Sequence, residues 1–146
     1  MPHTPSHRPV QAEGLPKPVG PYAPAMIFER LVFVSGQGAI DPTTGQLAGL
    51  DTETQVEQVF RNIRAILEAA GTDLSHVLRC GVFLVDMRDF AAMNAVYARV
   101  FGDHRPARTT VAVAALPHPG LRVEIDAVAY VPDRGQDALA HTPRRV

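Results

Sequence analysis

Arg108 is the side chain whose type and setting most directly suggest a binding role. It follows Pro106 and opens a run of small and β-branched residues that favours a strand. A guanidinium presents a planar fork that binds a carboxylate through two parallel hydrogen bonds. Glu124 and Asp126 lie on a later strand that could neighbour it. Two interpretations fit these residues: a structural ion pair, or a carboxylate site with a proton-transfer group beside it.

Two further positions combine a hydroxyl group with a glycine turn. Tyr22 follows Gly20 and Pro21, and Ser35 ends an apolar strand directly before Gly36. Glycine lets backbone approach a ligand closely, so strand ends of this kind often contact ligands. A purely structural role for either hydroxyl is the alternative.

Several other kinds of site are not indicated. The chain has six histidines without the spacing of metal ligands, so no metal site is expected. The pair Gly36 and Gly38 lacks the third glycine and the following helix of a dinucleotide-binding turn. Cys80, the only cysteine, falls in the middle of a predicted strand and is expected in the core rather than as a nucleophile.

Length and composition indicate one globular domain. The chain has 146 residues, 46% of them apolar, and a formal net charge of −1. This balance gives no basic surplus for nucleic acid or for an anionic membrane. The N-terminus has no apolar stretch typical of a signal peptide, so a cytoplasmic location is expected. We predict an extended segment at 1–17, a folded domain at 18–132 and a flexible tail at 133–146.

Apolar periodicity predicts two helices and five strands, in an α+β fold with a mixed sheet and both helices on one face. The helices are expected at Thr52–Ala70, with Thr52 and Gln55 as a capping box, and at Phe90–Phe101, with Asp89 as N-cap. A further short strand is possible near Arg8–Gln11. The main strands are expected at Ala25–Phe28, Leu31–Ser35, Leu78–Val85, Arg108–Ala114 and Arg122–Val131.

Strand alternation predicts which side chains face away from the helices. In the last strand Val123 and Ile125 are expected under the helices, and Glu124 on the opposite face. We also expect Arg108, Thr110, Ala112 and Ala114 on that opposite face, which would leave it partly bare of long polar side chains. Either another subunit covers this face or it is a modestly polar surface in contact with solvent.

At these residues the sequence resembles the Rid family of reactive-intermediate deaminases, also called the YjgF family. The resemblance extends in order from Pro18 to Tyr130, and the full ordered set of segments is far more specific than any one of them. The matching segments are G-P-Y at Gly20–Tyr22, V-S-G-Q at Val34–Gln37, D-P-x-T-G at Asp41–Gly45, Q-V-x-x-N-I at Gln58–Ile63, A-A-G at Ala69–Gly71, V-F-L-V-D-M at Val82–Met87, D-F-A-x-x-N-x-x-Y at Asp89–Tyr97, P-A-R-T-T-V at Pro106–Val111 and V-E-I-D-A-V-A at Val123–Ala129.

The resemblance implies a chorismate-mutase-like fold and a homotrimer with clefts between subunits. It implies cofactor-independent hydrolysis of enamines and imines of 2-amino acids, such as 2-aminoacrylate and 2-iminobutanoate, to 2-keto acids and ammonia. It also implies that Arg108 holds the substrate carboxylate and that Glu124 is linked to the attacking water. The remaining cleft residues implied by the resemblance are Tyr22, Ser35, Gly36, Phe83, Asn94 and Thr110.

Three positions depart from the pattern of the family. Thr110 stands where many deaminases carry cysteine, Pro24 stands where glutamine is common, and Gly38 replaces a bulkier residue and is expected to widen the pocket. A non-catalytic trimer that binds small carboxylates such as 2-keto acids, or a protein partner, is the alternative function. A ribonuclease role is less favoured, because the chain lacks interleaved basic and aromatic residues.

Overall fold

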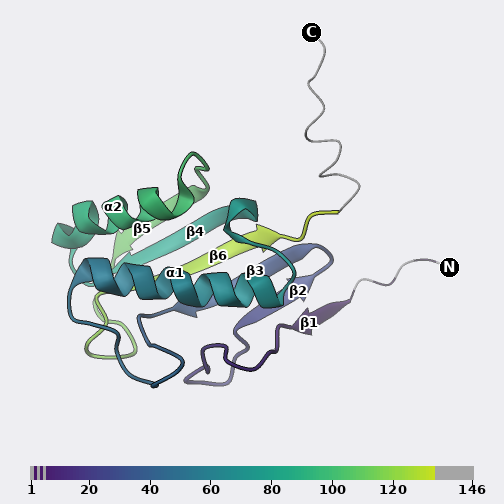
Figure 1. Ribbon diagram of the computed structural model, residues 1–146, viewed down its shortest axis with the longest axis horizontal. Coiled ribbons are helices and arrows are strands. Elements are labelled where there is room, and N and C mark those ends of the chain that lie inside the picture. The colour runs from purple at the N-terminus through teal and green to yellow at the C-terminus, as the bar shows by residue number, and fades with distance from the viewer. Residues whose placement is uncertain (1, 3, 5, 134–146) are drawn as a thin grey trace, which may run out of the picture.

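The computed structural model describes residues 2, 4 and 6–133, and the tail predicted at 133–146 therefore lies almost wholly outside the described residues. Six strands form one sheet in the order β1-β2-β3-β6-β4-β5. Two helices, α1 and α2, cover one face of this sheet (Figure 1). The predicted α+β arrangement with both helices on one face is confirmed. The strands are β1 (His7–Pro9), β2 (Ala25–Phe28), β3 (Leu31–Gln37), β4 (Val77–Leu84), β5 (Ala107–Ala112) and β6 (Val123–Tyr130).

The pairing of the strands makes the sheet mixed. Every neighbouring pair is antiparallel except β4 and β5, which run parallel. Helix α2 (Phe90–Phe101) makes the crossover between these two parallel strands. Consequently β4 lies between β5 and β6, and the strand of Arg108 does not neighbour the strand of Glu124. The expectation that these two strands could be neighbours is wrong.

Helix α1 (Thr52–Ala69) forms as its periodicity predicts, although its N-terminus is capped differently. The N-cap is Asp51, whose carboxylate accepts a hydrogen bond from the Thr54 amide at 2.9 Å. Thr52 is already the first helical residue, and Gln55 uses its side chain for bonds outside the helix. The predicted capping box is therefore wrong. Gly71, just past the end, has a φ of +88°, which favours glycine at this position.

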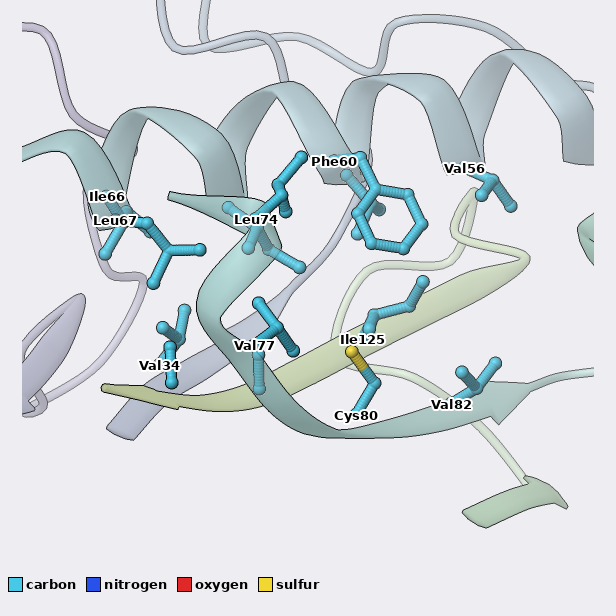
Figure 2. Close-up of a cluster of buried hydrophobic side chains, with 14 of the residues drawn as sticks. Val34, Val56, Phe60, Ile66, Leu67, Leu74, Val77, Cys80, Val82 and Ile125 are labelled. Carbon is cyan, nitrogen blue, oxygen red and sulfur yellow. The ribbon is translucent and has the colours of Figure 1, made fainter. Parts of the chain in front are cut away.

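The core lies between the helices and the sheet (Figure 2). The apolar stripe of α1, including Val56, Phe60 and Ile63, packs against alternate residues of the central strands. In β6 the odd-numbered positions from Val123 to Ala129 are buried, as predicted. Cys80 is also in this core, at 1% exposure, which confirms that expectation.

The face of the sheet away from the helices carries large apolar side chains. Leu31, Phe33 and Val111 are 36–44% exposed there. Phe33 lies beside Val128 on the neighbouring strand, and Val111 lies beside Phe83 in the same way, because each pair is in register. A sheet face exposed to water normally carries long polar side chains instead.

The side assigned to β5 in the sequence analysis is wrong. Residues that pair in register share one side of a sheet, and Arg108 pairs with the buried Cys80 while Thr110 pairs with the buried Val82. Arg108, Thr110 and Ala112 therefore lie on the helix side of the sheet. Alternation predicts which residues share a side, but for this edge strand it could not predict which side faces the helices.

Candidate active site

Glu124 and Gly36 are brought together by an irregularity in β3. The pairing of β3 with β6 shifts register between Val34 and Gln37, which places Ser35 and Gly36 at a bulge. Bulges occur frequently next to active sites because they redirect the chain locally. A Cβ atom at position 36 would lie only 2.8 Å from the carboxyl carbon of Glu124. Any side chain at position 36 would therefore displace this carboxyl group, which glycine leaves in place.

The Glu124 carboxyl is half-buried, and its environment disfavours the charged form. Burial raises its pKa above the usual range of a glutamate, and the nearby negative charge of Asp126 raises it further. Asp126 is held by the Gly81 amide, which donates to its Oδ1 atom at 2.8 Å. A carboxyl with a raised pKa is suited to accept and return a proton near neutral pH.

A pocket of about 420 Å³ opens beside Glu124. Three of the predicted site residues line it: Tyr22, Gly36 and Glu124. Most of its other walls are apolar, and they come from the segment before Tyr22, the loop after β3 and the loop before β6. These apolar walls include Pro16, Pro24, Ile40, Pro42, Pro117 and Leu121.

Ser35 and Tyr22 are connected through the backbone between them. The Ser35 hydroxyl donates to the Ala23 carbonyl oxygen at 2.7 Å, which ties the bulge of β3 to the segment that carries Tyr22. The Tyr22 hydroxyl accepts a long bond of 3.4 Å from the Val19 amide, and its side chain is 48% exposed at the pocket mouth. Phe83 pairs directly with Glu124 and so lies on the same side of the sheet.

Arg108 lies at the other edge of the sheet, against helix α2. Its guanidinium carbon is 4.7 Å from the ring centroid of Tyr97 and 5.7 Å from that of Phe90, distances typical of cation–π contacts. Among the described residues no carboxylate is within ion-pair distance of it, so the structural ion pair considered from the sequence is absent there. The aromatic rings hold the guanidinium without neutralising its charge, which leaves it able to bind an anion.

The predicted site residues thus form two groups on opposite sides of the sheet. Tyr22, Ser35, Gly36, Phe83 and Glu124 belong to β6 and its surroundings. Arg108 and Thr110 belong to β5, on the side of α2, the helix that carries Asn94. One copy of the chain does not bring Arg108 and Glu124 into a common site.

Two residues at the second group were not identified from the sequence as site residues. Phe90 and Tyr97 were assigned only to the apolar stripe of the second helix, which is also what a core helix shows. Their seven-residue spacing places both rings on one helix face, but the cation between them comes from a strand ten or more residues away. Only the packing of α2 against β5 reveals that contact.

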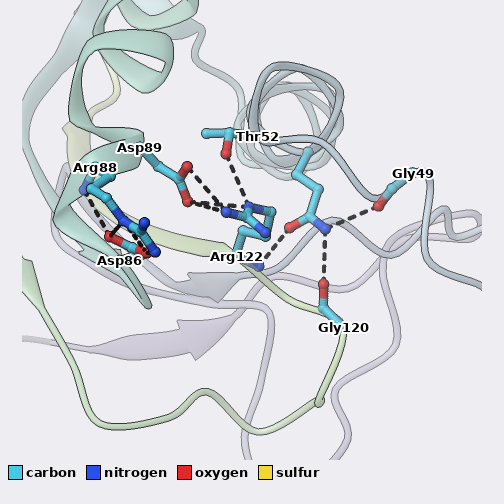
Figure 3. Close-up of polar contacts among 8 residues, drawn as sticks. Gly49, Thr52, Asp86, Arg88, Asp89, Gly120 and Arg122 are labelled. Carbon is cyan, nitrogen blue, oxygen red and sulfur yellow. Dashed lines mark hydrogen bonds and ion pairs between the residues drawn. The ribbon is translucent and has the colours of Figure 1, made fainter.

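A polar cluster fixes the loop before β6, which forms one wall of the pocket (Figure 3). The fully buried Gln55 amide donates to the carbonyl oxygens of Gly49 and Gly120, both at 2.9 Å, and its Oε1 accepts from the Arg122 amide at 2.7 Å. The Arg122 guanidinium contacts Asp89 at 2.9 Å. Asp89 is the N-cap residue of α2, as predicted, but its side chain bonds to Arg122 and makes no cap bond to the helix.

Within residues 2, 4 and 6–133, no group of three or more histidine, cysteine or acidic side chains is arranged to hold a metal ion. No helix in this part of the chain is both long and apolar enough to cross a membrane.

Comparison with known proteins identifies relatives along most of the chain. Residues 13–131 match the family described as endoribonuclease L-PSP. A RutC family protein of Pyrococcus horikoshii is 49% identical over 118 residues, which cover 81% of this chain and 93% of that protein. The human 2-iminobutanoate/2-iminopropanoate deaminase is 40% identical over 114 residues, which cover 78% of this chain and 82% of that protein.

Solved structures with similar sequences share the fold. RidA from the Antarctic bacterium Psychrobacter sp. superposes with a TM-score of 0.80 at 41% identity, covering 84% of this chain and 98% of that one. The YjgF gene product of E. coli has a TM-score of 0.80 at 34% identity, covering 86% and 99% of the two chains. With the ordered sequence segments, the sheet and the bulge beside Glu124, these matches establish that the chain belongs to the YjgF/Rid family.

Proposed function

We propose that this protein hydrolyses reactive imines and enamines of 2-amino acids to 2-keto acids and ammonia. The relatives named as 2-iminobutanoate/2-iminopropanoate deaminases support an imine deaminase in general. In the proposed reaction an enamine first tautomerises to its imine by taking a proton at carbon. Water then adds to the C=N carbon, and the C–N bond breaks to release ammonia and leave the keto group. Water is the only co-reactant.

The observation that carries this proposal is the half-buried Glu124 carboxyl at the pocket wall, with its pKa raised. In its ionised form Glu124 accepts a proton from the attacking water, and it returns that proton to the leaving nitrogen. A raised pKa brings proton affinity closer to neutral pH, where both transfers are efficient. Tyr22 lines the pocket, so its hydroxyl can orient water or substrate, while the Ser35 hydroxyl holds the bulge of β3 through its bond to the Ala23 carbonyl oxygen.

We further propose that the complete site forms between copies of the chain in a homotrimer. One copy would supply Glu124 and the pocket, and its neighbour would supply Arg108 to hold the substrate carboxylate, with Asn94 and Thr110 beside it. Two observations support this: Arg108 and Glu124 lie on opposite sides of the sheet, and the uncovered face carries exposed Leu31, Phe33 and Val111. Burying such apolar area stabilises an assembly by roughly 25 cal/mol per Å².

A competition assay tests the activity. An amino-acid oxidase generates imine in the presence of semicarbazide, which captures the imine unless the protein hydrolyses it first. We expect wild-type protein to suppress semicarbazone formation. Arg108→Ala should lower kcat/KM by roughly 10²–10³-fold, since each hydrogen bond to a charged group contributes about 1.5–3 kcal/mol. Arg105→Ala, at an exposed arginine in the loop just before β5, is the matched control and should change little.

Glu124→Gln separates catalysis from binding. It keeps the shape of the side chain but removes the proton acceptor, so turnover should fall by roughly 10²–10⁴-fold. Binding of a 2-keto acid, measured by calorimetry, should survive. If wild-type protein binds keto acids but hydrolyses no imine, the alternative of a non-catalytic carboxylate-binding protein is correct. RNA binding with steep salt dependence would instead favour a nucleic-acid role.

A further inference from the structure

We infer that the pocket beside Glu124 holds the substrate side chain, and that the preferred substrates are imines of large apolar 2-amino acids of leucine or phenylalanine size. This inference rests on the proposed function and names its substrate class. The 2-iminobutanoate and 2-iminopropanoate in the names of several relatives carry only short side chains.

The size of the pocket exceeds what a short side chain needs. It encloses about 420 Å³, whereas pockets of roughly 300–1,000 Å³ typically enclose drug-sized ligands. An imine such as 2-iminobutanoate, with about seven non-hydrogen atoms, would leave much of this space to water. Glu124 is part of the wall, so a substrate whose reacting carbon lies at this carboxyl has the rest of the pocket within reach of its side chain.

The inner walls offer carbon rather than unpaired polar groups. Two buried polar side chains line the pocket. Gln37, at 7% exposure, donates from its Nε2 atom to the Ser35 carbonyl oxygen at 3.1 Å, and the second is Asn62, at 2% exposure. Its amide donates to the carbonyl oxygens of Ile40 at 2.9 Å and Gly38 at 3.2 Å, and its Oδ1 accepts from Gln58 at 2.9 Å. These bonds occupy the amide on both sides. A polar substrate group would therefore lose its hydration without gaining a partner there.

Leu121 determines how far the pocket extends toward the loop before β6. A Cβ atom at position 38 would lie 2.7 Å from the Leu121 Cδ1 atom, so this leucine occupies the space that Gly38 leaves free. The expectation that Gly38 widens the pocket is corrected by this contact. The loop that carries Leu121 is held through Gly120 and Arg122 by the buried Gln55 side chain. The apolar wall is thus preorganised, which reduces the entropic cost of binding.

Two basic side chains that line the pocket, Lys17 and His118, are both exposed. His118 turns its Nδ1 atom toward its own loop, where it accepts a bond from the Gly120 amide at 3.1 Å. Because both side chains are exposed, a second anionic group on the substrate would meet them only where the pocket opens to solvent. Imines of acidic amino acids are accordingly expected to be poor substrates.

The test compares kcat/KM in the semicarbazide assay for imines made from alanine, leucine, phenylalanine and glutamate. One methylene in an apolar pocket changes kcat/KM by roughly 10–200-fold, so the leucine imine should exceed the alanine imine at least about tenfold. Leu121→Phe, which narrows the pocket, should reduce this ratio about tenfold. Leu116→Ala, in the same loop but away from the pocket, tests for general loosening and should leave the ratio unchanged.

A binding measurement keeps the inference independent of turnover and of variant folding. With wild-type protein, 4-methyl-2-oxopentanoate should bind at least about tenfold more tightly than pyruvate in calorimetry, about 1.4 kcal/mol. This result without any imine hydrolysis would refute the proposed function and support the pocket assignment. Equal or weaker binding of the larger keto acid, comparable kcat/KM for the leucine and alanine imines, or a preference for the glutamate imine would overturn the inference.

Discussion

Replacing Gln55 by leucine should destabilise the protein by about 3 kcal/mol. The side chain is fully buried and makes three bonds, to the Gly49 oxygen, the Gly120 oxygen and the Arg122 amide, at 2.7–2.9 Å. Each such bond contributes a net 0.5–1.5 kcal/mol, roughly, and a buried group left unpaired costs about 1–3 kcal/mol. The three backbone partners are only partly buried, so water can reach them after the substitution. Each unpaired group then costs about 1 kcal/mol, the lower end of the range for buried groups, which gives about 3 kcal/mol for the three.

Thermal unfolding at one fixed protein concentration measures this effect, because Tm depends on concentration for any protein that oligomerises. A loss of about 3 kcal/mol in a chain of this length corresponds to a decrease of roughly 6–12 °C in Tm. Gln46→Leu, at an exposed glutamine, is the matched control and should shift Tm little.

Gln55→Glu separates the two ends of the side chain. It retains an oxygen to accept from the Arg122 amide but places a second oxygen against the carbonyls of Gly49 and Gly120. We expect it to be at least as destabilising as Gln55→Leu. If Gln55→Leu unfolds at the same temperature as Gln46→Leu, the three bonds of Gln55 do not stabilise the loop before β6. The pocket wall formed by that loop is then not preorganised by Gln55.

Three further predictions concern Glu124 and Cys80. Burial is the main cause of the raised Glu124 pKa, and the Asp126 charge raises it further. Asp126→Asn keeps an acceptor for the Gly81 amide but removes that charge, so the acidic limb of the kcat/KM profile should move to lower pH. Because the pKa of Glu124 is raised in the folded protein, its contribution to stability is fully present below its ordinary pKa and is lost as pH rises through the raised value. Asp126→Asn should make this loss of stability smaller in unfolding titrations at different pH. An unchanged pH dependence of stability would contradict the coupling between the two carboxyl groups. Gly36→Ala should lower kcat/KM by roughly 10²-fold without unfolding the chain, because the added methyl displaces the Glu124 carboxyl; wild-type activity would show that its position is not critical. The Cys80 thiol, whose pKa is raised to about 11 mainly by burial, should resist a disulfide reagent at pH 8 until denaturant is added, and rapid labelling of native protein would show that β4 opens.

The sequence by itself determined the local elements and most of the core. The stripe of α1 and the buried side of β6 follow from a repeat of 3.6 or 2 residues, which any chain with that pattern must bury against something. The burial of Cys80 followed in the same way from its place within an apolar strand. The ordered segments also determined the family, and hence which residues to examine as a site.

The capping box is an example of what local pattern could not decide. Thr52 and Gln55 have the right spacing, but Asp51 caps the helix and Gln55 bonds to three backbone groups, two of them more than sixty residues away. The Gln55 side chain bonds to backbone groups that the fold places beside it, because an unpaired buried amide costs more free energy than a helix cap contributes.

Only the tertiary structure decided how the predicted site residues are distributed. Alternation groups Arg108 with Thr110, but the pairing with β4 is what puts both on the side of α2, where the Arg108 guanidinium lies against Phe90 and Tyr97. The bulge in β3 likewise brings Gly36 against Glu124, an approach that no spacing in the chain encodes. Strand order and register are set by long-range packing of the whole core, so contacts between distant elements follow from the fold rather than from any local segment of the chain.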